Sequence, residues 1–329
     1  MTRDLASPTR AWRGPALLLG VVLAACGPDP EPAGRRFSFS FSPPEGTSFI
    51  QHLKTTRVQE FSAAGVESRT QTHASDTATR FTVDRTDTGY DIRAEQVSTA
   101  MTKDGEPVDD PVTDLLRGMP ATYQTDPDGR LVAIRGFEEV SERIASELPS
   151  ELSSLLASVI TEEALTKQGV DEWNGRYGDL IGQTIRIGDI VPSSKSTEFA
   201  GGVNAVEYTA TWFPENVRCG GRDCVRIRIF RNTNLEALKE RLAQVVGERA
   251  AGLFDDLGAA ESPEGFESSS EIDRLVDPAT LLTQRETQRR LVIQRVPISA
   301  EVSGVLKINE TKQYAFEYTP IGEVGEERP

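Results

Sequence analysis

The chain has 329 residues, of which 37% are hydrophobic and 26% are charged, and this length can bury the core of one large domain or two small ones. The formal net charge of −15 argues against nucleic acid as a partner, because phosphate contacts need clustered lysine and arginine. Three cysteines and two histidines are scattered along the chain, whereas a structural zinc site needs four such ligands at characteristic spacings. We therefore expect no metal and no other cofactor.

The first 25 residues have the pattern of a secretory signal peptide. Three arginines and a single acid lie within residues 1–13, and an apolar run follows from Pro15 to Ala25. This run is shorter than the roughly 20 residues that a membrane-spanning helix needs. Its length, basic start and small final residues are typical of export signals, so we expect residues 1–25 to be removed.

The end of this segment, LAAC at residues 23–26, resembles the lipobox of bacterial lipoproteins. The resemblance implies that the Cys26 thiol receives a diacylglyceryl group, that a dedicated peptidase cuts before Cys26, and that the new amino group is acylated, for example with palmitate. Gly27 stands where an aspartate can retain such proteins at the inner membrane, so the resemblance implies a cell-envelope protein anchored by lipid to the outer membrane. The alternative is an ordinary signal peptide whose cleavage site happens to precede a cysteine.

The rest of the chain divides into a tether, a domain and a tail. Residues 26–36 contain three prolines and predict a semi-rigid tether. We expect a single domain over residues 37–320, and a polar C-terminal tail over residues 321–329.

Long alternations of polar and apolar residues predict extended antiparallel strands over residues 47–61, 66–86 and 89–103. The alternation changes phase near Glu95–Gln96 and again near Gln294–Arg295, which predicts a β-bulge at both places. Because bulges bend long strands, the expected fold class is α+β. It would have a long curved antiparallel sheet, resembling half a barrel, packed against a few helices.

Apolar residues at helical spacing predict two helical blocks. The first covers residues 137–160, and the second begins at a capping box formed by Thr233 and Glu236. Trp173 and Tyr177 follow the first block, and these aromatic side chains either close the core or line a pocket.

Cys219 and Cys224 lie on either side of a Gly-Gly-Arg-Asp turn between two alternating runs. In an exported protein, paired cysteines usually form a disulfide, and closing so short a loop contributes about 2 kcal/mol. A redox centre favours C-x-x-C beside a helix N-terminus. We expect a disulfide here, with metal binding or redox chemistry as the alternatives. If Cys26 is lipidated, these two cysteines remain as an even pair.

The sequence carries no recognised catalytic motif. It lacks G-x-S-x-G, a glycine-rich phosphate loop and H-E-x-x-H, and His52 and His73 lie among polar residues in β-type runs. The DPDG stretch at residues 126–129 fails as an EF-hand loop, because Arg135 would stand where a bidentate glutamate is required. It predicts a tight hairpin turn instead.

Residues 44–192 loosely resemble uncharacterised bacterial envelope lipoproteins. The resemblance rests on the Gly46–Phe49 turn, the DGRLVAIRG hairpin at residues 128–136 and the W-x-x-x-x-G stretch at residues 173–178. That group carries no activity to transfer. By architecture, the expected domain is also similar to periplasmic lipoprotein carriers, a likeness of fold alone.

We therefore expect a lipid-anchored envelope protein that is a non-enzymatic binding or interaction module. The first alternative is a carrier of a lipid or another apolar ligand, which predicts an apolar groove. The second is a hydrolase that uses two carboxylates in a cleft, with shifted pKa values. The expected partners are the membrane, through Cys26, and an envelope protein or lipid ligand.

Overall fold

The computed structural model describes residues 34–108, 117–118, 120–147, 161–199, 202–255, 257, 260, 263–298 and 302–319. The predicted signal peptide, Cys26, most of the tether, the C-terminal tail and residues 148–160 of the first helical block lie outside these residues. From Arg35 onward the chain forms one compact unit.

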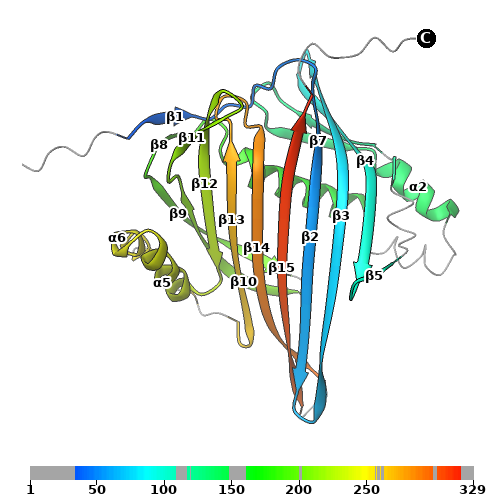
Figure 1. The fold of residues 1–329 in the computed structure, drawn as a ribbon, viewed down its shortest axis with the longest axis vertical. Helices are drawn as coiled ribbons and strands as arrows, with labels where there is room; N and C mark the ends of the chain where they lie inside the picture. The colour runs from blue at the N-terminus through cyan, green and yellow to red at the C-terminus, as the bar shows by residue number, and fades with distance from the viewer. Residues whose placement is uncertain are drawn as a thin grey trace, which may run out of the picture. The chain divides into compact units, whose positions relative to one another are not determined.

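Within the described residues of this unit, a 13-stranded antiparallel sheet dominates, and it is open and curled (Figure 1). Its strands follow the order β7-β6-β4-β3-β2-β15-β14-β13-β12-β10-β9, with β5 on β4 and β11 on β12. The first and last long strands, β2 and β15, are therefore neighbours in the middle of the sheet. Strands β1 and β8 pair separately.

The strands have the following bounds: β1 Arg36–Ser38, β2 Thr47–Ala63, β3 Val66–Thr86, β4 Gly89–Lys103, β5 Glu106–Pro107, β6 Pro120–Thr125, β7 Leu131–Arg135, β8 Thr184–Arg186, β9 Ile190–Phe199, β10 Val203–Trp212, β11 Asn216–Cys219, β12 Arg222–Asn232, β13 Phe266–Val276, β14 Thr283–Pro297 and β15 Ser303–Tyr318. The prediction of a long curved antiparallel sheet with a few helices is confirmed in outline. Strands outweigh helices so strongly that the described fold is mainly β rather than an even α+β mixture.

The two predicted bulges have different outcomes. In β4 the pairing with β3 skips Val97, so the change of phase near Gln96 is a real bulge. The bulge predicted near Gln294–Arg295 is wrong, because β14 pairs with β15 without interruption as far as Pro297. The apolar run continued past the end of β14 into β15, and two strands were taken for one. The bulge in β14 lies instead at Gln284.

The helices are short: α2 Phe137–Glu147, α4 Glu162–Trp173, the π-helix η1 Asn174–Gly178, α5 Leu235–Val245 and α6 Glu248–Gly252. In the described part of the chain no helix is long and apolar enough to cross a membrane. The capping box at α5 is a wrong prediction, because Asn234 is the N-cap and its side chain accepts from the Ala237 N–H. Thr233 is held by the sheet, where its hydroxyl accepts from the Ser268 N–H at 3.0 Å.

Each face of the sheet has its own hydrophobic core. On the inner face, α4, η1 and the N-terminal segment cover a cluster that includes Phe39, Phe41, Trp173 and Ile227. On the outer face, α5 and α6 cover β10 and β12 through a cluster that includes Leu238, Leu242 and Phe254, packed around Phe230. This division leaves the inner face of the central strands next to η1, where the candidate site lies.

Candidate functional site

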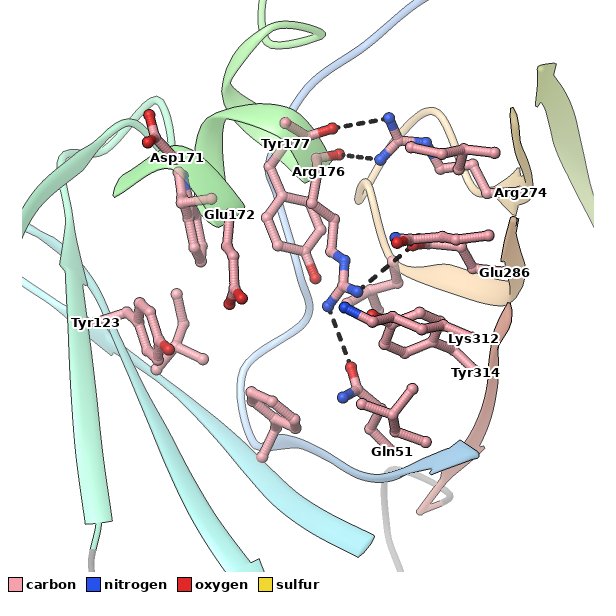
Figure 2. A pocket seen from close by; sticks show the side chains of 18 of the residues that line it. Gln51, Tyr123, Asp171, Glu172, Arg176, Tyr177, Arg274, Glu286, Lys312 and Tyr314 are labelled. Atoms are coloured by element: carbon pink, nitrogen blue, oxygen red, sulfur yellow. Dashed lines mark hydrogen bonds and ion pairs between the residues drawn. The ribbon is translucent and has the colours of Figure 1, made fainter. Parts of the chain in front are cut away.

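A cavity of about 680 Å³ lies between the inner face of the sheet and the α4–η1 segment (Figure 2). Successive side chains of a strand point to opposite faces, so alternate residues of the central strands line it. Its wall includes Phe49, Gln51 and Leu53 of β2, Phe81 and Val83 of β3, Ile272 and Arg274 of β13, Glu286 and Gln288 of β14, and Lys312 and Tyr314 of β15.

One wall of the cavity is apolar. Phe49 and Phe81 are cross-strand partners whose rings stack at 4.9 Å between centroids, and Val83 and Ile92 continue this surface along β3 and β4. Trp173 at the end of α4 also faces the cavity and is buried. These side chains suit the hydrocarbon part of a ligand.

The opposite wall is charged and centres on Arg176 of η1. Its guanidinium lies 3.6 Å from the Glu286 carboxylate, donates to Gln51 Oε1 at 3.1 Å and stacks 4.9 Å over the ring of Tyr314 (Figure 2). Glu286 is only 2% exposed, and the Gln288 amide also donates to it. Arg176 is thereby fixed against three central strands.

Hydrogen bonds between residues that are far apart in the sequence hold the α4–η1 segment over the sheet. Arg274 of β13 donates to the backbone oxygens of Arg176 and Gly175 at 2.8 and 2.9 Å. At the other end, the Trp173 indole donates to the Gly129 oxygen at 3.1 Å. Gly129 has a φ of +88°, and a Cβ at this position would lie 2.2 Å from Phe41. The backbone that accepts from Trp173 therefore requires glycine at residue 129.

The charges of this cluster stabilise one another. Burial tends to raise the pKa of Glu286, but Arg176 and Arg274 outweigh it and lower the pKa below its ordinary value. Burial tends to lower the pKa of Arg176, yet Glu286 raises the pKa overall. Burial also raises the pKa of Tyr314, to about 12. At neutral pH the cluster therefore contains two cations, one carboxylate and a neutral phenol.

The cluster is not fully satisfied. Glu286 Oε2 and Arg274 Nε are buried, and neither has a hydrogen-bond partner among the described residues. Because Arg274 and Glu286 are direct partners across β13 and β14, an unused donor and an unused acceptor lie on adjacent strands. A buried polar group without a partner is costly, so these two atoms make the cluster less stable than a fully paired one.

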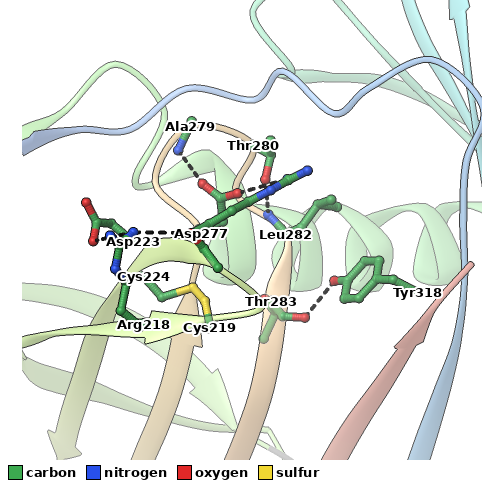
Figure 3. The surroundings of a disulfide bond; sticks show 12 residues. Arg218, Cys219, Asp223, Cys224, Asp277, Ala279, Thr280, Leu282, Thr283 and Tyr318 are labelled. Atoms are coloured by element: carbon green, nitrogen blue, oxygen red, sulfur yellow. Dashed lines mark hydrogen bonds and ion pairs between the residues drawn. A yellow bond between two sulfur atoms is a disulfide. The ribbon is translucent and has the colours of Figure 1, made fainter. Parts of the chain in front are cut away.

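The predicted disulfide is present in the structure (Figure 3). Cys219 ends β11, Cys224 lies in β12, and their Cα atoms are 6.0 Å apart. Nearby, Asp277 accepts from the Ala279 N–H at 2.9 Å and pairs with Arg222 at 3.4 Å. The bond fastens a hairpin at one end of the sheet and does not line the cavity.

The other candidate residues have separate positions. Cys26 lies outside the described residues. His52 and His73 lie on opposite faces of the sheet, because His52 pairs with Ala78 and His73 with Arg57. The DPDG stretch forms the predicted turn, in which Asp126 Oδ1 accepts from the Arg130 N–H at 2.8 Å. Within the described residues, no three histidine, cysteine or acidic side chains gather as metal ligands do.

The two interpretations of Trp173 and Tyr177 turn out to be compatible, because both side chains belong to the core and both line the cavity. Sequence reasoning missed Gln51, Arg176, Arg274 and Glu286. One usable signal was available, because Arg274 interrupts an apolar inner-face series between Ile272 and Val276. A charge at such a position is buried and needs a partner.

Neither a family model nor a curated protein matches the sequence. Among solved structures, one reported as lipid–protein interactions in lipovitellin is 7% identical, covers 86% of this chain and 26% of its own, and has a TM-score of 0.42. This chain thus spans about a quarter of that one. DynF from the dynemicin biosynthesis pathway of Micromonospora chersina is 9% identical over 85% of both chains, with a TM-score of 0.18. A LolA superfamily protein of Nitrosomonas europaea is 6% identical over 86% of this chain and 90% of its own, with a TM-score of 0.12. Likeness at this level supports no functional transfer, so the functional argument rests on the cavity.

Proposed function

We propose that this protein is a non-enzymatic binding module that holds an amphipathic small molecule in the inner-face cavity. The observation that carries the proposal is the contrast between the two walls. Phe49, Leu53 and Phe81 offer an apolar surface, while Arg176 and Glu286 offer a charged one. Small-molecule sites are typically cavities of this size, mostly apolar with a few well-placed polar groups.

Binding fits the electrostatics better than hydrolysis does. A carboxylate pair in hydrolysis needs one acid whose pKa is raised, so that it can donate a proton. The buried carboxylate here, Glu286, has a lowered pKa and is held ionised between Arg176 and Arg274. It therefore acts as a fixed acceptor. Asp171 and Glu172 also line the cavity, but both are exposed on α4.

We also propose that Cys26 anchors the protein by lipid in the cell envelope, at the outer membrane. The support is the LAAC pattern behind a short apolar run, followed by a proline-rich tether. Two or more acyl chains bind a bilayer stably, whereas one chain binds it weakly. An anchored binding module would sample ligands that leave or enter the membrane.

Filling the cavity tests the binding proposal. Leu53→Trp adds an indole to the cavity wall, and Val58→Trp on the same strand adds one to the outer face. We expect the fluorescent apolar dye phenylnaphthylamine to bind the wild type, and Leu53→Trp to weaken its affinity about tenfold. Val58→Trp should bind as the wild type does. Equal binding by all three proteins, or no binding to the wild type, would contradict the proposal.

Processing in cells tests the anchor independently of the cavity. Globomycin inhibits the lipoprotein signal peptidase, so we expect it to accumulate the precursor that still carries residues 1–25. The wild type should also incorporate a labelled fatty acid in growing cells, and Cys26→Ala should not, because it lacks the thiol that receives the lipid. Normal cleavage under globomycin would show that the chain has an ordinary signal peptide.

A further inference from the structure

The inner face changes character along the strands beyond the cavity. At its apolar end, Tyr318, Phe49 and Phe81 lie side by side on β15, β2 and β3. Four rungs further along, Arg290 of β14 pairs with Glu310, which pairs with Arg57. Lys312, which lines the cavity, lies on the next rung toward the cavity from these arginines. We name Arg57, Arg290 and Lys312 the cationic band.

The charges of the cationic band are incompletely balanced. Glu310 lies 3.4 Å from Lys312 and is its ion-pair partner. Neither Arg57 nor Arg290 has a carboxylate within 4.0 Å among the described residues, although the whole chain carries a net charge of −15. By contrast, Arg228 on the outer face is paired with Glu271. Three cations around the single carboxylate of Glu310 leave an excess of positive charge at one place in an acidic chain, and such an excess favours an anionic ligand.

At Arg57, the cationic band also borders free space. A second hollow of about 460 Å³ lies there, and its lining includes Thr55, Arg57, Ser75 and Met101 together with the carboxylate of Glu310. Leu53 and Arg57 are four residues apart on β2, about 13 Å along the strand. A molecule seated against Leu53 can therefore extend its polar end to Arg57.

The acidic groups around the cavity favour the same orientation. Asp171 and Glu172 of α4 lie on the side of Tyr123, away from Lys312 and Tyr314 (Figure 2). They would repel an anion at that side. Glu286 does not repel one from the other side, because Arg176 and Arg274 together outweigh its single charge.

We propose that the ligand is an anionic amphiphile, whose apolar part fills the cavity and whose carboxylate or phosphate lies on the cationic band. This inference rests on the proposed binding function and specifies the chemistry of the ligand. Arginine suits both anions, because its guanidinium donates two parallel hydrogen bonds to either group.

The test compares a dansyl-labelled undecanoic acid with its methyl ester, which differs only in lacking the charge. We expect the wild type to bind the acid about tenfold more tightly than the ester. The double variant Arg57→Gln/Arg290→Gln should lose this preference and keep the affinity for the ester. Arg289→Gln, at the neighbouring outer-face position of β14, is the matched control and should behave as the wild type does. Added salt should weaken binding of the acid alone.

Competition distinguishes the two anions. Stronger displacement of the dansyl acid by lysophosphatidic acid than by lauric acid identifies a phosphate ligand, and the reverse order identifies a carboxylate. Equal affinity of the wild type for acid and ester would overturn the inference and leave the binding proposal standing. Failure of the wild type to bind acid, ester and phenylnaphthylamine would overturn both. Unchanged acid preference in the double variant would also overturn the inference, as would loss of both ligands by a double variant whose unfolding curve matches that of the wild type. If the double variant is unfolded, the salt dependence of the wild type decides, and an acid affinity that salt does not change would overturn the inference.

Discussion

At the scale of single residues, the site depends on one buried carboxylate. Glu286 balances Arg176 and offsets part of the charge of Arg274. Breaking a buried ionic cluster by removing one partner is far more costly than removing an exposed pair, because the remaining charges stay in a poor solvent. Glu286 therefore stabilises the inner face as well as shaping the cavity.

Replacing Glu286 tests this role. Glu286→Gln keeps the volume and should lower the free energy of unfolding by about 3 kcal/mol at pH 7. The exposed control Glu317→Gln should change it by less than about 0.5 kcal/mol.

The stability contributed by Glu286 should also depend on pH. Because the folded-state pKa of Glu286 lies below its ordinary value of 4.5, the contribution of this carboxylate to the free energy of unfolding is complete above pH 4.5 and is lost as pH falls through the folded-state pKa. Urea unfolding across this acidic range should show a smaller loss of stability in Glu286→Gln than in the wild type. If the stability of Glu286→Gln fell with pH as steeply as that of the wild type, Glu286 would not be the source of the acid sensitivity.

At the scale of elements, a tertiary contact determined which residue caps helix α5. Thr233 and Glu236 have the spacing of a capping box, but the Thr233 hydroxyl bonds to the Ser268 backbone in β13. The N-cap of α5 is therefore Asn234, and asparagine is also a favoured N-cap residue. Local pattern located the helix within two residues and misassigned the residue that starts it.

Removing the Asn234 cap should weaken α5 specifically. We expect Asn234→Ala to lower the free energy of unfolding by about 1 kcal/mol, because the Ala237 N–H loses its acceptor. Amide exchange at Ala237 should accelerate. Glu236→Ala is the control, since this side chain is exposed and alanine cannot make the capping-box bond that glutamate or glutamine would make. A larger effect from Glu236→Ala than from Asn234→Ala would restore the capping-box interpretation.

At the scale of the whole molecule, two strands that are far apart in the sequence, β2 and β15, meet in the middle of the sheet. Strand β15 pairs with β2 from Phe49 to Ala63, and together they join the two halves of the sheet. The cavity also depends on the pairing of β2 with β15, because Tyr314 and Lys312 of β15 are the cross-strand partners of Leu53 and Thr55 of β2. The site thus forms only when both β2 and β15 have folded.

Hydrogen exchange provides a test of this architecture. Amides at the centre of β2 and β15 should exchange most slowly, because they open only with the whole sheet. Amides of β7 and β9, at the ends of the sheet in the described part of the chain, should exchange fastest among the strands. Mass spectrometry of peptic fragments after labelling would measure both. Faster exchange in β2 and β15 than in the terminal strands would contradict the central role of this pair.

Local features of the sequence were sufficient to predict the strands, but they did not identify the residues of the site. The runs over 66–86 and 89–103 coincide with β3 and β4, and the run over 47–61 with most of β2, because alternation is a property of neighbouring residues. The four polar cavity residues that sequence reasoning missed come from β2, η1, β13 and β14. No local pattern relates Arg176 to Gln51 or to Glu286, which are both more than a hundred positions away from it. The lone charges of the cluster looked like solvated ones.

By itself, the sequence determined the expectation of export and lipid attachment, the antiparallel strands and the Cys219–Cys224 pair, whose bond the structure contains. Each depends on residues within a short stretch, where spacing alone carries the chemistry. Only the tertiary structure decided that β2 meets β15, that Arg176 lies against Glu286, and that the cationic band continues from the cavity. These arrangements depend on the order and register of distant strands. Burial then turned isolated charges into a coupled cluster.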